Sequence, residues 1–242
     1  SHMLRTVLTA LIIAIGITAL VGILTAIDAL KSSINNSFAD MGANTFSIRN
    51  LGRGAQIGSS HGRKFRKKES ISFEEARQFS QQFDFPASIS VSVLASEGST
   101  IKYKSKKTNP NIEIYGADAN YIQAAALNVN YGRNFSPMEV ENGANVVIIG
   151  SDLVKTLFGK DYPLDQIITV GNSKYKVIGV LKERGSTLGF GGDKFLIIPL
   201  INVRQNFGLA NLDYQITGMV QSIQSVDIAA GEATGLFRKI RK

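Results

Sequence analysis

Hydrophobic and polar positions are distributed very unevenly along this chain. Residues 6–27 include no charged side chain, and a helix of that length would measure about 33 Å, close to the roughly 30 Å of a bilayer's hydrocarbon core. A buried core helix usually has a polar face, and the apolar part of a signal peptide is usually shorter. The pattern therefore predicts a membrane span, and residues 28–41 continue it as a helical stalk.

Beyond the stalk, apolar residues recur at every second position in several short segments. This period predicts strands with one face toward a core and the other toward water. We expect the strands of 87–116 to be consecutive neighbours in an antiparallel sheet. The predicted strands are 45–50, 87–95, 100–105, 111–116, 143–150, 166–170, 174–182, 194–200 and 214–221.

Besides a short helix over 151–158 and a short helix or turn over 118–128, two longer helices are predicted between and after these strands. Ser72 and Glu75 have the spacing of a capping box, which begins a helix that runs to Phe83. Apolar residues at spacings of three and four predict an amphipathic helix over 226–240. Residues 139–141 read as a solvated loop. The fold class is therefore α+β.

Composition narrows the chemistry that the chain can perform. It has no cysteine, and its histidines are His2 and His61, so thiol nucleophiles and zinc fingers are excluded. His2 lies in residues 1–3, which are typical of the remnant of a cleaved purification tag. No segment matches a phosphate-binding or dinucleotide-binding loop. We expect no enzyme activity and no catalytic, cofactor-binding or metal-binding residues.

Positive charge is the remaining polar signal, with a net charge of +8. A Gly- and Ser-rich loop, 51–69, contains a dense cluster that is a candidate surface for an anionic partner: Arg63, Lys64, Arg66, Lys67 and Lys68. Solvated surface explains the cluster equally well. Lys102, Lys104 and Lys106 would alternate along a strand and so share one of its faces, as anion contacts or as edge protection. Few aromatic residues accompany these charges, so we do not expect nucleic-acid binding.

Short motifs in a fixed order extend over nearly the whole chain. The motifs are Leu4–Thr9, Gly16-Ile17, Ala29–Lys31, Gly42–Thr45, Tyr131–Phe135, Val147–Gly150, Leu157–Gly159, Lys176–Val180 and Ile198–Leu200. Together they resemble MacB/FtsX-type ABC transporter permeases and the MacB-like periplasmic core domain. Asp165, where the family usually carries glycine, and the basic loop 51–69 depart from the family pattern.

The resemblance implies a domain organisation and a set of partners. Residues 4–43 would form the first transmembrane helix and stalk, 44–116 with 205–242 a discontinuous porter-like α+β lobe, and 117–204 an inserted mainly-β lobe. The chain would belong to the bacterial inner membrane, with its domain facing the periplasm. Its partners would be a cytoplasmic ABC ATPase, a second permease copy and, for efflux, a periplasmic adaptor and an outer-membrane channel.

The implied function is mechanical transmission. ATP binding and hydrolysis in the cytoplasm would close a permease dimer, and the stalk would carry this movement outward to export a drug, peptide or lipoprotein. Ser33 and Asn36 are candidate stalk positions at which the movement could be followed. Two alternatives remain: an FtsX-like signalling scaffold that activates a cell-wall hydrolase, and a membrane-anchored protein that binds anionic envelope polymers.

Overall fold

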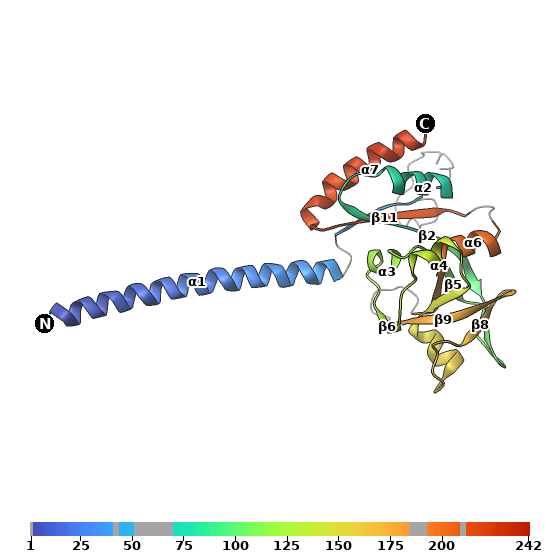
Figure 1. The fold of residues 1–242 in the computed structure, drawn as a ribbon, viewed down its shortest axis with the longest axis horizontal. Coiled ribbons are helices and arrows are strands. Elements are labelled where there is room, and N and C mark those ends of the chain that lie inside the picture. Colours follow the sequence, from blue (N-terminus) through green and yellow to red (C-terminus); the bar gives the residue numbers. More distant parts are fainter. Residues whose placement is uncertain (1, 41–43, 51–69, 184–192, 209–211) are drawn as a thin grey trace, which may run out of the picture. The chain divides into compact units, whose positions relative to one another are not determined.

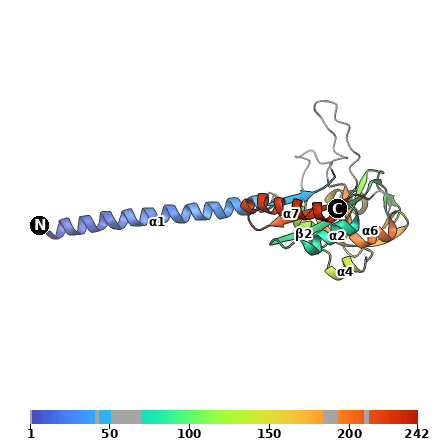
Figure 2. The ribbon, with the colours of Figure 1, turned by 90° about the horizontal axis from the view of Figure 1, so that it is seen from above.

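The computed structural model describes residues 2–40, 44–50, 70–183, 193–208 and 212–242 (Figures 1 and 2). The chain divides into two compact units, Ser1–Ala43 and Asn44–Lys242. The first unit contains one helix and the second contains a mixed sheet with its covering helices.

The helix of the first unit, α1 (His2–Asp40), is continuous over 39 residues, as the pattern predicts. Large apolar side chains such as Leu11, Ile15 and Leu20 are exposed along it. Among the described residues, none of the helices reaches the length and hydropathy needed to cross a membrane. The membrane span expected over 6–27 is therefore not confirmed.

In the described part of the second unit, eleven strands form one sheet in the order β1-β11-β2-β5-β10-β7-β9-β8-β3-β4, with β6 also paired to β9. The pairs β5–β10 and β7–β9 are parallel, so the sheet is mixed. The strands are β1 (Thr45–Ile48), β2 (Ala87–Ser99), β3 (Ile101–Tyr103), β4 (Lys106–Lys107), β5 (Ile112–Ala117), β6 (Val129–Gly132), β7 (Val146–Ile149), β8 (Ile167–Val170), β9 (Ser173–Leu181), β10 (Phe195–Pro199) and β11 (Tyr214–Val220).

Helices cover both faces of this sheet. Figure 1 shows α2 and α7 on one side of β11 and β2, and α3 on the other. The helices are α2 (Phe73–Gln82), α3 (Tyr121–Ala124), α4 (Pro137–Glu141), α5 (Ser151–Leu153) with a π-helical continuation (Val154–Phe158), α6 (Leu200–Asn206), a 3-10 turn (Ile223–Ser225) and α7 (Val226–Ile240). The capping box of α2 and the bounds of α7 are confirmed.

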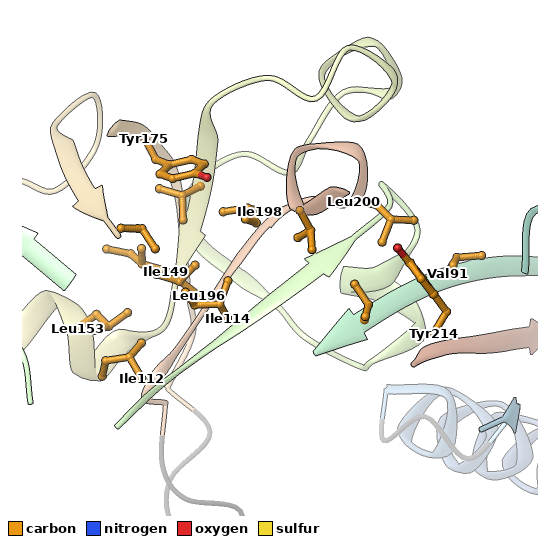
Figure 3. Packing of buried hydrophobic residues seen from close by; sticks show 14 of the residues in the cluster. Val91, Ile112, Ile114, Ile149, Leu153, Tyr175, Leu196, Ile198, Leu200 and Tyr214 are labelled. Atoms are coloured by element: carbon orange, nitrogen blue, oxygen red, sulfur yellow. The ribbon is translucent and has the colours of Figure 1, made fainter. Parts of the chain in front are cut away.

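The core lies on both faces of the central strands. In β10, Leu196 and Ile198 belong to one buried cluster, whereas Ile197 between them belongs to a second cluster. The first cluster extends along the sheet from Tyr175 to Tyr214 (Figure 3). Because their side chains are buried on both faces, the central strands read as continuous apolar runs rather than as alternating ones.

The predicted strand 100–105 is wrong in two respects. It is a hairpin in which Lys104 occupies the turn with a φ of +50°, so Lys102, Lys104 and Lys106 do not share one strand face. Its first arm, β3, pairs with β4 and β8 rather than with β2 or β5. Burial decides this pairing: Tyr103 is buried against Phe158, with ring centroids 4.4 Å apart.

Residues 139–141 are also not a loop. They belong to α4, whose first turn has a capping box between Ser136 and Glu139. The division into a porter-like lobe and an inserted lobe stays a prediction. Backbone hydrogen bonds cross the predicted boundary between the lobes. They join β5 of the porter-like lobe to β10 of the inserted lobe, and β8 of the inserted lobe to β3 of the porter-like lobe.

Candidate functional site

The chain enters the second unit at Asn44, beside the strand that leads to α7. β1 pairs antiparallel with β11 from Thr45 opposite Met219 to Ile48 opposite Ile216. The buried Asn44 side chain donates from Nδ2 to the Val220 carbonyl oxygen at 2.5 Å, and the Val220 amide donates to the Asn44 carbonyl oxygen at 3.0 Å. The start of β1 and the end of β11 are therefore joined by both side-chain and backbone hydrogen bonds.

Aromatic packing extends this connection from β1 to both helices. The ring centroid of Phe46 lies 5.7 Å from that of Phe83, which stacks on Phe79 at 5.0 Å, and Phe79 meets Phe237 of α7 at 6.1 Å. Gly218 leaves the room for Phe46, because a Cβ there would lie 2.3 Å from its ring. We call this set the β1–β11 junction: Asn44, β1, β11, Phe83, α2 and α7.

An ion pair fastens the end of α7 to the start of α2. Arg241 donates from Nε to Glu75 Oε1 at 3.0 Å and from Nη2 to the Ser70 carbonyl oxygen at 3.1 Å. Burial opposes ionisation of Glu75, but the Ser72 hydrogen bonds and the Arg241 charge outweigh it and hold the pKa of Glu75 below its ordinary value. The junction is thus closed by charge as well as by packing.

Arg204 of α6 approaches the same end of α2 from another side. Its guanidinium carbon lies 3.8 Å from the centroid of the Phe73 ring, and its Nη2 lies 3.9 Å from Glu74 Oε1. A guanidinium over an aromatic face is attracted by the ring quadrupole. Two arginines from chain-distant helices therefore hold the first turn of α2.

Two further polar side chains buried in this unit, those of Asp118 and Asn202, have structural partners. Asp118, at the end of β5, accepts from the Ser90 hydroxyl at 2.8 Å and from the Val91 amide at 2.6 Å. Burial raises the pKa of Asp118 despite these hydrogen bonds. Asn202 is fully buried and accepts from the Tyr175 hydroxyl at 2.7 Å. These bonds satisfy buried polar groups and hold neighbouring elements together.

The described side chains do not converge on a reaction centre. A hollow of about 430 Å³ lies where β2 bulges, lined by Leu94, Ala95, Ser96 and Glu97. Its one carboxylate has no second acid or base beside it in that lining. Within the described ranges, three or more His, Cys, Asp or Glu side chains nowhere gather as a metal site.

The predicted site residues fall in two places. Ser33 and Asn36 lie in α1, and their side chains are outside the described part. The whole basic cluster also lies outside the described residues: Arg63, Lys64, Arg66, Lys67 and Lys68. Sequence reasoning missed the contact between Glu75 and Arg241, which are 166 positions apart. In the sequence, Asn44 after Gly42-Ala43 was a signal that could have indicated the β1–β11 junction.

Comparison with known proteins identifies relatives along nearly the whole chain. Residues 6–236 match the family described as the MacB-like periplasmic core domain. The chain is 27% identical over 238 residues to the macrolide export ATP-binding/permease protein MacB of Bdellovibrio bacteriovorus, with 98% of this chain and 34% of that protein covered. It is 29% identical over 218 residues to MacB of Neisseria gonorrhoeae, with 90% and 31% covered. It thus spans about a third of the length of these relatives.

Two solved structures share the fold. The periplasmic region of MacB from Actinobacillus actinomycetemcomitans matches with a TM-score of 0.65 and 20% identity, over 84% of this chain and 86% of that one. The extracellular domain of the noncanonic ABC-type transporter YknZ from Gram-positive bacteria matches with a TM-score of 0.57 and 24% identity, over 70% and 83%. Since the family match covers almost all of its residues, the chain belongs to the family of MacB-like periplasmic core domains.

Proposed function

We propose that this chain is the extracytoplasmic, non-catalytic part of an ABC transporter permease, in which it transmits ATP-driven dimer closure to the cell envelope. The observation that carries the proposal is the β1–β11 junction. A displacement that reaches Asn44 passes through its two hydrogen bonds to Val220, at the end of the strand that leads into α7. A transmitting element needs such a rigid connection between the places where force enters and leaves.

The geometry of the pairing suits a load along the strand. The four register pairs of β1 with β11 would be sheared together rather than opened one at a time, because strand hydrogen bonds run perpendicular to the strand axis. The Phe79 and Phe237 contact and the Arg241 to Glu75 ion pair then oblige α2 and α7 to move with the sheet.

The proposal includes partners and a location. A cytoplasmic ABC ATPase would supply the energy and a second permease copy would complete the dimer, with an adaptor and an outer-membrane channel for efflux. The relatives' names support export of a drug such as a macrolide, and peptide or lipoprotein cargo fits the same movement. We place the apolar segment of α1 in the cytoplasmic membrane. What supports this placement is its row of exposed apolar side chains, and extraction of membranes at alkaline pH tests it.

The test of transmission uses cysteine crosslinking in membrane vesicles. These 242 residues contain no cysteine. In the complete permease, cleared of any cysteine elsewhere and co-expressed with its ATPase, Ser33→Cys or Asn36→Cys therefore reports the approach of two stalks. We expect disulfide formation to increase when ATP is added. With an ATPase variant that cannot bind nucleotide, ATP should cause no such increase. Crosslinking that ignores nucleotide, at accessible positions and with an active ATPase, would contradict the proposal.

A second variant tests the junction itself. Asn44→Ala removes the side-chain hydrogen bond to Val220 and leaves the backbone bond in place. We expect nucleotide-dependent crosslinking to persist while transport falls, because the stalk still moves and the outer unit follows less. Unchanged transport would show that this asparagine does not take part in transmission.

A further inference from the structure

Four directly opposite residues form a row across the outward face of β4, β3, β8 and β9. Lys107 lies opposite Lys102, Lys102 lies opposite Thr169, and Thr169 lies opposite Lys174. Directly opposite residues point to the same face of a sheet. We call these residues the lysine row: Lys107, Lys102, Thr169 and Lys174.

The opposite face of the same strands shows that the lysine row points to solvent. Ile101 and Tyr103 on β3, Ile168 on β8 and Tyr175 on β9 are buried in the core. The three lysines of the row, which alternate with them, are exposed. At the usual spacing between strands, the row measures about 14 Å from Lys107 to Lys174.

The charge of the row is not neutralised by its neighbours. Within the described residues, none of its three lysines makes an ion pair or a side-chain hydrogen bond. Lys102 and Lys107 are directly opposite like charges, an arrangement that costs stability. Lysines often protect the edge of a sheet, and this explains Lys107 on the edge strand β4. It does not explain Lys102 and Lys174, because β3 and β9 lie inside the sheet.

Two of the lysines beside the row are paired, whereas the exposed Lys106 makes no ion pair within the described residues. Lys104 Nζ lies 3.6 Å from Asp161 Oδ2, and Lys176 Nζ lies 2.7 Å from Asp165 Oδ1. The other flanking positions include the uncharged Ile167 and Gly171. The unneutralised charge therefore follows the row across four strands and includes Lys106 at its β4 end.

This shape selects among anionic partners. A bilayer offers charge in a plane. Neighbouring strands twist by roughly 20–25° each, so the lysines of successive strands point in different directions and do not all face one plane. An acidic protein partner is usually held by aromatic and arginine side chains, and a single-stranded nucleic acid by aromatic stacking. The lysine row contains neither aromatic nor arginine side chains.

We propose that the lysine row binds a linear, flexible polyanion whose phosphate or carboxylate groups follow the row across the sheet. The inference does not depend on the proposed transport function. It assigns anion binding to described residues of the sheet, separately from the cluster expected at Arg63–Lys68.

Inorganic polyphosphate with a fluorescent end label is a suitable probe, titrated with the full chain at low salt and followed by anisotropy. The test variant is Lys102→Gln, Lys107→Gln and Lys174→Gln combined. The matched control removes three paired lysines, Lys104→Gln, Lys155→Gln and Lys176→Gln, and so causes the same loss of charge. Thermal unfolding establishes that both variants are folded.

We expect the row variant to bind about ten-fold more weakly and the control to change by about two-fold or less. The slope of log affinity against log salt should fall by about two in the row variant, at about 0.7 per lost phosphate contact. Equal losses in both variants, or no binding at all, would overturn the inference and return the row to solvated surface.

Two further titrations decide between sources of the anion. If phosphatidylglycerol vesicles bind through the row and polyphosphate does not, the partner is a lipid surface and the inference is wrong. If neutralising Arg63, Lys64, Arg66, Lys67 and Lys68 abolishes polyphosphate binding while the row variant retains it, the row is not the binding site. Loss of polyphosphate binding in the row variant alone supports the inference.

Discussion

The β1–β11 junction and the lysine row belong to the same sheet, but the charges at the junction are paired and those of the row are not. At the junction, the exposed ends of α2 and α7 are joined by Arg241 and Glu75, and aromatic rings fill the space below them. At the row, Lys102 and Lys107 face each other with no acid beside either within the described residues. The junction is closed within the molecule, whereas the row is left open to a partner. The difference separates a part of the fold that is held by internal contacts from a part whose charge faces solvent.

Removing the centre of the aromatic packing should have the largest effect. Phe79 is fully buried between Phe83 and Phe237, so Phe79→Ala should lower the free energy of unfolding by about 3–5 kcal/mol. Ile167→Ala beside the row, where the side chain is exposed, should cost less than about 0.5 kcal/mol. Urea unfolding of both variants measures this, and similar losses would erase the distinction between the two regions.

Acid should remove the stabilising contacts that carboxylates of this unit make with their partners, and it should leave the lysine row unaffected. Hydrogen bonds from Arg133 lower the pKa of Glu139 to about 2 from its ordinary 4.5. A lowered folded-state pKa contributes stability that is complete above pH 4.5 and is lost as the pH falls toward 2. Glu139→Gln should cost on the order of 1–2 kcal/mol at pH 7, after solvent screening at the exposed Arg133.

Unfolding by urea between pH 7 and pH 2 checks this expectation. The wild-type and Glu139→Gln curves should converge as the pH falls toward 2, because Glu139 is already protonated in the unfolded chain and becomes protonated in the folded chain as the pH approaches its folded pKa. Curves that stay parallel over the whole range would show that the pair with Arg133 contributes nothing.

Loosening the ion pair of the junction should have a smaller effect. Arg241→Met removes the charge that faces Glu75 and the guanidinium whose carbon lies 5.0 Å from the centroid of the Phe237 ring, so we expect a loss of about 1 kcal/mol. The pKa of Glu75 should rise, because the Arg241 charge contributes to holding it down. An NMR pH titration of the Glu75 carboxyl measures the shift, and an unchanged pKa would exclude the contact in solution.

Relieving the repulsion in the row should have the smallest effect and the opposite sign. Lys102→Gln with Lys107→Gln should stabilise the free protein by a few tenths of a kcal/mol at low salt, since like charges no longer face each other. The gain should disappear at high salt, where exposed charges are screened. Lys104→Gln, which breaks a pair with Asp161, is the control and should not stabilise. A loss of stability in the double variant would mean that these lysines have partners.

Several elements were predictable from short stretches of sequence. The capping box of α2 needs Ser72 and Glu75, three residues apart, and the amphipathic pattern of α7 needs 15 consecutive residues. The corresponding box of α4 was available in Ser136 and Glu139 but was read as a loop, because two glutamates close together also fit solvated surface. The family motifs were likewise local, and the family match confirmed them.

Strand order and the candidate site depended on residues far apart. Period-two alternation identifies a strand without naming its neighbours, so the pairing of β3 with β8 could not be predicted from 100–105. Burial of Tyr103 against Phe158 decides that pairing, and the same pairing aligns Lys102 with Lys174 through Thr169. The sequence by itself determined α1, α2 and α7, most strand positions and the family, because caps and periodicity act over a few residues. Only the tertiary structure decided the junction and the lysine row, because both arise where alternate strand faces from distant segments are buried together.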